Sequence, residues 1–192
     1  MVKLAWERGE NITRIEDEYR DILDENRNPT GRVHKRGESF QKGDYFLCNC
    51  CWIMNSAGEF LITRRALGVK WAPGMWGVAG GGVLSGEDSL TAAIREAKEE
   101  VGVDLLPHNA LLFAHGQIDN AFVDHWLFRQ EFDLSQVNLQ TDEVIDARAA
   151  TWDEISAMIE RGEFIGNSCE TIKGFLNAAN CPATGDISAQ AQ

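Results

Sequence analysis

The sequence predicts an α+β fold in which a mixed β-sheet is flanked by helices. Two observations support this class. Several apolar segments follow one another as hairpins, and predicted strands and helices alternate irregularly along the chain. A doubly wound parallel sheet would need a regular alternation of strand and helix. The chain has 192 residues, of which 44% are hydrophobic and 25% charged, the composition of one globular domain of ordinary size.

The first segment, residues 1–43, is polar and charged, and we expect it to be an N-terminal extension packed on the main domain. Its sequence YRDILDENRNPTGRVHK predicts a β-hairpin, with strands at Tyr19–Leu23 and 31–34. The turn between them contains Asn28, Pro29 and Gly31. The main domain is expected to span residues 44–180, and residues 181–192 to form a flexible tail.

The main domain begins with its clearest strand, the aromatic and apolar segment Phe46–Met54. The turn sequence NSAG at 55–58 then returns the chain into a second strand at 59–65, which makes a hairpin. The other strands are predicted at 75–79, 111–117 and 122–132, and the helices at 87–101, from Thr151 or Trp152 onward, and from Asn167 or Ser168 to about residue 179.

The charge balance narrows the class of partner. There are 18 basic and 30 acidic residues, a net charge of -12. A nucleic acid polymer is therefore not expected as a partner, because its phosphate backbone needs clustered Lys and Arg. A small phosphorylated ligand held by a few basic groups is compatible with this charge, and so is the recruitment of divalent cations.

The apolar segments predict no membrane partner. The residues after Met1 are polar, and no apolar run approaches the roughly 20 residues that span a bilayer. We therefore expect a cytoplasmic protein. A homodimer formed partly by the N-terminal hairpin is compatible with the sequence.

The cysteines are interpreted as thiols rather than as a disulfide framework, because their number is odd. In the strand Phe46–Met54, Cys48 and Cys50 should share one face while Cys51 takes the other. The five cysteines are Cys48, Cys50, Cys51, Cys169 and Cys181.

The helix predicted at 87–101 carries three glutamates close together. At 100° per residue, Glu96, Glu99 and Glu100 lie opposite an apolar stripe that should face the core. Glu96 and Glu100 repel each other at i, i+4, and the C-terminal half of a helix favours cations. A divalent cation would relieve both conflicts, and carboxylates are ligands that Mg²⁺ or Mn²⁺ prefers. The stripe consists of Leu90, Ile94, Ala97 and Val101.

The same helix and the glycines before it carry a long motif with fixed spacing. It is Gly81-x5-Glu87-x7-Arg95-Glu96-Ala97-x-Glu99-Glu100-x-Gly102-Val103. This motif resembles the Nudix box, the signature of the Nudix hydrolases: every charged and glycine position of that pattern is filled, and Ala97 stands where an aliphatic residue is expected. The resemblance implies a Nudix-type α/β/α sandwich and hydrolysis of a nucleoside diphosphate linked to another group X.

The resemblance also implies a set of metal ligands. Glu96, Glu99 and Glu100 match the box glutamates that hold Mg²⁺ or Mn²⁺. The backbone carbonyl of Gly80 or Gly81 would add a further ligand.

Catalytic and positioning roles follow from the same resemblance. Arg95 matches the arginine that orients a box glutamate, and Glu87 the glutamate that stabilises the junction of loop and helix. The base that deprotonates the attacking water is one of the box glutamates or a Glu from a later loop. Glu143, which precedes a predicted strand and a Trp-led helix, is the candidate in that loop, with a solvent-facing charge as the alternative.

Two segments ahead of the box are ENRNPTGRVHKRGE and WIMNSAGEFLITRRALGVKWAPGMW. They resemble a subgroup of Nudix proteins related to isopentenyl-diphosphate isomerase. That isomerase uses a catalytic Cys in the loop where this chain has residues 80–82, and a His where it has Phe46. Since neither residue is present, hydrolysis is the favoured reaction and isomerisation the alternative. A non-catalytic nucleotide sensor is a third possibility, which the intact acidic set argues against.

The expected substrate is small, phosphorylated and of the nucleotide type. Arg64 and Arg65 end a strand beside the box, and Lys70 lies in the following loop, so each is a candidate phosphate ligand, with a surface ion pair as the alternative. Trp126 is a candidate for stacking on a base, with burial in the core as the alternative. Trp71, Trp76 and Phe122 are aromatic candidates of the same kind.

Overall fold

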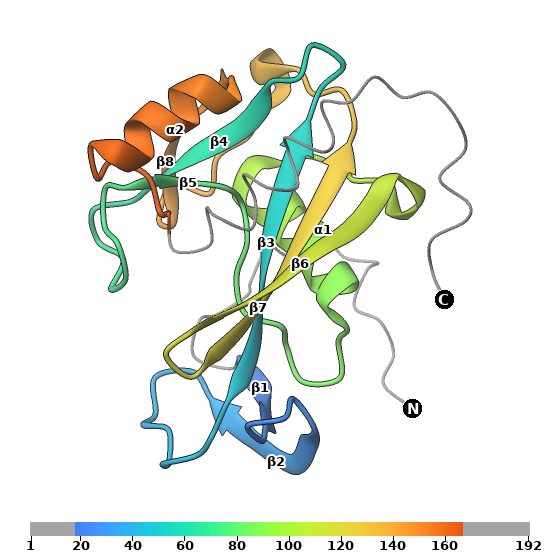
Figure 1. Ribbon diagram of the computed structural model, residues 1–192, viewed down its shortest axis with the longest axis vertical. Coiled ribbons are helices and arrows are strands. Elements are labelled where there is room, and N and C mark those ends of the chain that lie inside the picture. The colour runs from blue at the N-terminus through green and yellow to red at the C-terminus, as the bar shows by residue number, and fades with distance from the viewer. Residues whose placement is uncertain (1–17, 167–192) are drawn as a thin grey trace.

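The computed structural model describes residues 18–166, which form a two-stranded hairpin, a six-stranded sheet and two α-helices (Figure 1). The large sheet has the order β5-β4-β3-β7-β6, with β8 paired to β4. β3 and β7 are parallel and the other pairs antiparallel, so the α+β class and the mixed sheet are confirmed. Its strands are β3 (Phe46–Met54), β4 (Phe60–Arg65), β5 (Trp76–Gly77), β6 (Ala110–Ile118), β7 (Ala121–Arg129) and β8 (Val144–Ala150).

Helix α1 (Ser89–Val101) covers one face of the sheet (Figure 1). The side chain of Asp88 caps its first turn by accepting a hydrogen bond from the N–H of Thr91, and Gly102 ends it in the left-handed region. The small side chains of Ala93 and Ala97 let the helix pack closely on the sheet. The core on this face comprises Cys51, Ile53, Leu61, Ala79, Ala93, Ala97, Val101, Leu105 and Phe128.

Helix α2 (Trp152–Glu160) covers the β4 and β8 side of the opposite face (Figure 1). Thr151 and Glu154 form a capping box at its start, and Ile155 and Met158 are its buried residues. Because side chains alternate along β3, Cys51 contacts the α1 core while Trp52 contacts the α2 core.

The N-terminal hairpin consists of β1 (Tyr19–Leu23) and β2 (Pro29–Lys35), and it packs on the main domain (Figure 1). Leu23 pairs with Tyr45 just before β3. Asp21 accepts hydrogen bonds from Ser85 and from the N–H of Gly86 in the loop before α1. These contacts hold the hairpin beside the segment that carries the glycines.

Several predicted boundaries differ from the structure. α1 begins at Ser89 because Asp88 is its cap. The strand expected at 75–79 is only Trp76–Gly77, since the following residues cross to β3, where Ala79 pairs with Cys51. The hairpin expected from β3 and β4 pairs only at Met54 and Phe60, because the main partner of β4 is β8.

Two short 3-10 helices, Pro107–Asn109 and Leu134–Gln136, were not predicted. The final helix expected from residue 167 and the tail at 181–192 lie outside the described residues. Between residues 18 and 166, no helix is long and apolar enough to cross a membrane.

Candidate active site

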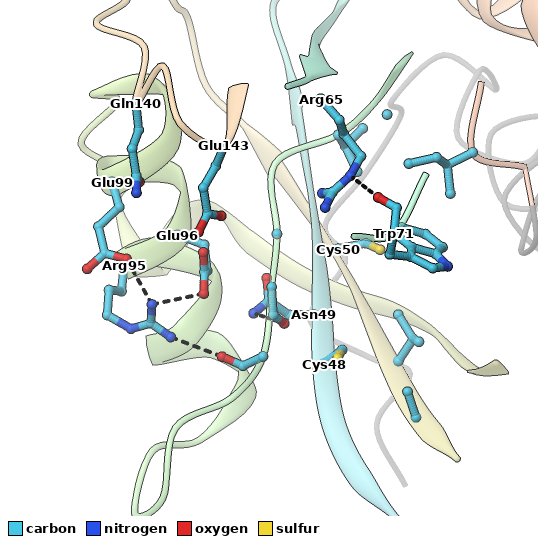
Figure 2. Close-up of a pocket in the computed structure, with 18 of the residues that line it drawn as sticks. Cys48, Asn49, Cys50, Arg65, Trp71, Arg95, Glu96, Glu99, Gln140 and Glu143 are labelled. Carbon is cyan, nitrogen blue, oxygen red and sulfur yellow. Dashed lines mark hydrogen bonds and ion pairs between the residues drawn. The ribbon is translucent and has the colours of Figure 1, made fainter. Parts of the chain in front are cut away.

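A cavity of about 990 Å³ is lined by residues of α1, of the middle of β3 (residues 48–52) and of the loop before β8. Figure 2 shows Glu96, Glu99 and Glu143 on one side of it and Arg65 and Trp71 on the other. The glycine loop 80–82 and residues of the N-terminal hairpin complete its wall. The fold therefore brings together segments that are far apart in the sequence.

Arg95 is the centre of the ion-pair network in this cavity. Its Nη1 donates to Oε1 of Glu96 and to Oε2 of Glu99, each at 2.9 Å (Figure 2). Its Nε and Nη2 donate to the two carboxylate oxygens of Glu87 at 3.0 and 3.1 Å, and Nη2 also reaches the carbonyl of Gly82. Arg95 thus orients two carboxylates on α1 and ties them to the loop.

Glu96 and Glu100 are buried, with exposed fractions of 9% and 2%. The expectation that they lie opposite the core-facing stripe is wrong, because both belong to the buried side of α1 with Ala93 and Ala97. Burial raises the pKa of Glu96 to about 7, and it raises the pKa of Glu100 well above its usual value. Their mutual repulsion adds to the shift of Glu100.

The glycine loop approaches these carboxylates closely. The N–H of Gly80 donates to Oε2 of Glu100 at 3.2 Å. A Cβ on Gly81 would lie 2.5 Å from Oε1 of Glu96, so glycine leaves the space that this carboxylate occupies. The carbonyl of Gly81 accepts hydrogen bonds from the backbone and side chain of Asn49, at 2.9 and 3.3 Å.

Glu143 immediately precedes β8 and lines the cavity on the same side as the α1 glutamates (Figure 2). Its side chain is 22% exposed and lies 3.7 Å from Nη2 of Arg36. The negative charge of Glu143 contributes to the raised pKa values of both Glu96 and Glu100. The structure therefore places a fourth carboxylate within electrostatic reach of the helix.

The expected substrate ligands fall into two groups. Arg65 lines the cavity, where it donates from Nε to the carbonyl of Trp71 at 2.9 Å and lies over the Trp71 ring. Arg64 is exposed and donates to the carbonyl of Gly74, and it does not line the cavity. Lys70 is also exposed and outside the cavity. Trp126 lies on the α1 face, where Nε1 donates to Ser89.

The chemistry of these residues fits a divalent cation. Clustered carboxylate oxygens are the preferred ligands of Mg²⁺ and Mn²⁺, and Glu96 and Glu100 are buried on the same side of α1, where burial raises the pKa of both. Within residues 18–166, no three His, Cys, Asp or Glu side chains are gathered as a metal-binding group. In place of a cation, Arg95 donates hydrogen bonds to one carboxylate oxygen of Glu96 and one of Glu99.

Comparison with known proteins agrees with this geometry. The family model described as NUDIX domain matches residues 47–167. The chain belongs to the Nudix family. An uncharacterized Nudix hydrolase from Listeria monocytogenes is 38% identical over 148 residues, covering 76% of this chain and 86% of the relative. Together with the fold, these matches support a Nudix pyrophosphohydrolase, the enzyme class expected from the sequence.

The relatives also include isopentenyl-diphosphate isomerases, the enzymes whose reaction is the alternative to hydrolysis. An isopentenyl-diphosphate Delta-isomerase from Klebsiella pneumoniae is 31% identical over 147 residues, covering 72% of this chain and 77% of that enzyme. The crystal structure of DR0079 from Deinococcus radiodurans aligns with a TM-score of 0.68 at 21% identity, over 82% of this chain and 98% of that chain. The latter likeness shows the shared fold.

The cavity wall includes residues of the N-terminal hairpin region that the sequence did not identify as site residues. Arg20, Arg36 and Glu18 come from the N-terminal hairpin and its flanks, ahead of the segment matched by the Nudix model. Cys48 and Cys50 share a face as predicted and also line the cavity. Burial raises the pKa of these two thiols to about 11 and about 12, so they stay protonated.

Proposed function

We propose that this Nudix protein is a metal-dependent hydrolase that cleaves a pyrophosphate bond in a nucleoside diphosphate linked to another group X. The observation that carries the proposal is the set of buried carboxylates beside the glycine loop, Glu96 and Glu100, with Glu99 joined to Glu96 through Arg95. Burying these carboxylates together is costly even with the Arg95 ion pairs, and a bound cation would lower that cost.

The proposed ligands of Mg²⁺ or Mn²⁺ are Glu96, Glu99, Glu100 and the carbonyl of Gly80. Gly80 is favoured over Gly81 because Asn49 already uses the Gly81 carbonyl. When bound, the cation neutralises pyrophosphate charge and lowers the pKa of a water molecule.

The chain's own residues would supply the positioning and the proton transfer. Arg95 holds Glu96 and Glu99 in fixed rotamers, so less side-chain entropy remains to be lost when substrate binds. Glu143 faces the cavity and is the candidate base that takes the proton of the attacking water, with a box glutamate as the alternative. Its Oε1 lies 3.7 Å from Nη2 of Arg36, and this ion pair links Glu143 to the N-terminal hairpin region.

Substrate contacts are proposed from the opposite wall. Arg65 and Trp71 form a cationic and aromatic surface there, with the guanidinium 5.4 Å from the ring centroid. A phosphate could bind the guanidinium, and a base could stack on Trp71, which is 50% exposed. Arg64, Lys70 and Trp126 lie outside the cavity, so their positions do not support the direct contacts expected of them.

A substrate panel tests the proposal. Release of phosphate and nucleotide is measured for nucleoside diphosphates, nucleoside triphosphates, ADP-ribose and isopentenyl diphosphate, with Mg²⁺ or Mn²⁺ and with a chelator. Cation-dependent cleavage of a nucleotide is expected. Isomerisation of isopentenyl diphosphate without hydrolysis would replace the proposal by the alternative enzyme, and tight nucleotide binding without product would indicate a sensor.

A further inference from the structure

The N-terminal hairpin contributes an arginine to the wall of the cavity. Arg20 lies on β1, outside the segment 47–167 that the Nudix model matches, yet its side chain lines the same cavity as Glu96. The guanidinium lies over the ring of Phe46, with its central carbon 5.1 Å from the ring centroid. It also lies against the backbone of Gly82, the last residue of the glycine loop.

The charge of Arg20 is poorly compensated in the described part of the chain. Its side chain is 17% exposed, and its ion-pair partner Glu18 is as far as 4.0 Å away. The Nε–H is buried and has no hydrogen-bond partner among the described residues. Removing a cation from water is unfavourable unless an anion and hydrogen-bond acceptors compensate it. The terminal N–H groups of Arg20, which lines the cavity, are therefore suited to an anion that enters it.

Arg36 provides a contrast within the same hairpin region. Its Nη1 donates to both carboxylate oxygens of Glu18 at 2.9 Å, and its Nη2 lies 3.7 Å from Glu143. Arg36 is thus already engaged by protein carboxylates. Of these two arginines, Arg20 is the one with unused hydrogen-bonding capacity among the described residues.

Gly82 is needed for this placement of Arg20. A Cβ at residue 82 would lie 2.4 Å from Nε and from the central guanidinium carbon, closer than two such atoms can approach. The obstructing group is the end of a flexible side chain, so an alanine here would displace the guanidinium and leave the backbone path unchanged. The carbonyl of Gly82 accepts a hydrogen bond from Arg95, which places Arg20 next to the network of box residues.

We propose that Arg20 binds a phosphate oxygen of the substrate, so that the N-terminal hairpin forms part of the substrate-binding site. The identity of the anion as a pyrophosphate group rests on the proposed function. A guanidinium that packs against an aromatic ring and a glycine has restricted freedom, and its remaining N–H donors suit a phosphate.

The test measures binding of inorganic pyrophosphate to the full chain by calorimetry, in the presence of Mg²⁺. Arg20→Ala is expected to weaken binding about 10- to 100-fold, the usual effect of losing charged hydrogen bonds. Arg20→Lys should recover part of the affinity, because lysine keeps the positive charge but lacks the paired N–H donors of the guanidinium. Lys42→Ala, which removes an exposed cation that does not line the cavity, is the control and should leave affinity unchanged.

Gly82→Ala provides a second variant that keeps Arg20 but displaces it. It should weaken pyrophosphate binding like Arg20→Ala, and the double variant should be little worse than either single one. A purely structural role of Arg20 would lower the melting temperature and leave pyrophosphate affinity as in the wild type. That result, or the absence of pyrophosphate binding to the wild type, would overturn the proposal.

The role of Arg20 and the proposed function can be rejected independently of each other. Arg20-dependent binding of pyrophosphate without hydrolysis of any compound in the panel would reject the proposed function and retain this binding site. Hydrolysis of a nucleotide with the same KM in wild type and Arg20→Ala would retain the function and reject the role of Arg20. A raised KM with a nearly unchanged kcat is the expected result.

Discussion

The N–H of Gly80 donates a hydrogen bond to the carboxylate of Glu100 at 3.2 Å, which joins the glycine loop to the buried side of α1. The helix and the loop are therefore one unit, in which backbone and carboxylates fix each other's positions. Neighbouring glycines contribute differently to this unit, so their substitutions should separate folding from activity.

Gly80→Ala should destabilise the fold. Gly80 has φ of 153°, and a Cβ there would lie 2.4 Å from the backbone oxygen of Asn49, which cannot move without disturbing β3. We expect a loss of about 2–4 kcal/mol in the free energy of unfolding, measured by urea denaturation. Gly81→Ala is the matched control, because its Cβ would meet only the carboxylate of Glu96. It should keep most of the stability but lose activity, and equal stability losses in both variants would contradict this account.

Arg95→Ala should also lower stability, since it leaves the partly buried carboxylates of Glu87, Glu96 and Glu99 without their shared partner. The expected cost is about 3 kcal/mol in chemical denaturation. Lys98→Ala, on the same helix, removes an exposed ion pair with Asp104 and should cost less than about 1 kcal/mol. Similar costs for the two variants would show that the Arg95 network adds little.

Cation binding should stabilise the protein more at high pH than at low pH. The folded-state pKa of Glu96 is raised to about 7, so its contribution to stability is present below its unfolded pKa and is lost as pH rises through about 7. Above that pH a cation would offset the repulsion between Glu96 and Glu100. At about 100 times Kd, Mg²⁺ should add roughly 2.7 kcal/mol, a rise of several degrees in Tm.

Thermal unfolding at pH 8 and pH 5, with Mg²⁺ and with chelator, measures this effect. Glu96→Gln combined with Glu100→Gln is the control and should lose the Mg²⁺-dependent rise in Tm. An equal rise in this double variant would place the cation elsewhere.

His125 should make the fold sensitive to acid. It is 2% exposed, neither ring nitrogen has a partner among the described residues, and burial lowers its pKa to about 4. The unfolded chain therefore binds the proton more readily, so stability present above about pH 6.5 is lost as pH falls toward 4. The loss is on the order of 3 kcal/mol.

Urea denaturation between pH 4 and 7 tests this dependence. His125→Phe should flatten the profile, whereas His108→Ala, at an exposed position, should leave it as in the wild type. A profile that His125→Phe does not alter would assign the acid sensitivity to other groups.

Much of the site could be predicted from spacing along one helix. The four-residue interval between Arg95 and Glu99 favours their ion pair, because residues one turn apart on a helix are neighbours. The contact between Arg95 and the adjacent Glu96 does not follow from this spacing. The burial of Glu96 and Glu100 could not be predicted in this way. Hydrophobic periodicity places charged residues toward solvent, and only the packing of a small alanine face against the sheet encloses them.

The long-range parts of the site were beyond sequence reasoning. Arg20 and Gly82 are distant in the chain, and no local pattern signals that a hairpin strand will lie on the glycine loop. Arg64 and Arg65 are adjacent and chemically equal, yet alternation along β4 sends only Arg65 into the cavity. The strand pairing was also not evident from the sequence: β3 pairs along its whole length with β7, and with β4 only at Met54 and Phe60.

The most direct test of the central claim compares wild type with Glu99→Gln and Glu100→Gln on whichever nucleotide the wild type cleaves, at saturating Mg²⁺ or Mn²⁺. Both variants keep the shape of the side chain and remove its charge. The account predicts that kcat falls by about 100-fold or more in each while the circular dichroism spectrum is unchanged. Full activity in both variants would contradict the assignment of these carboxylates to the catalytic site.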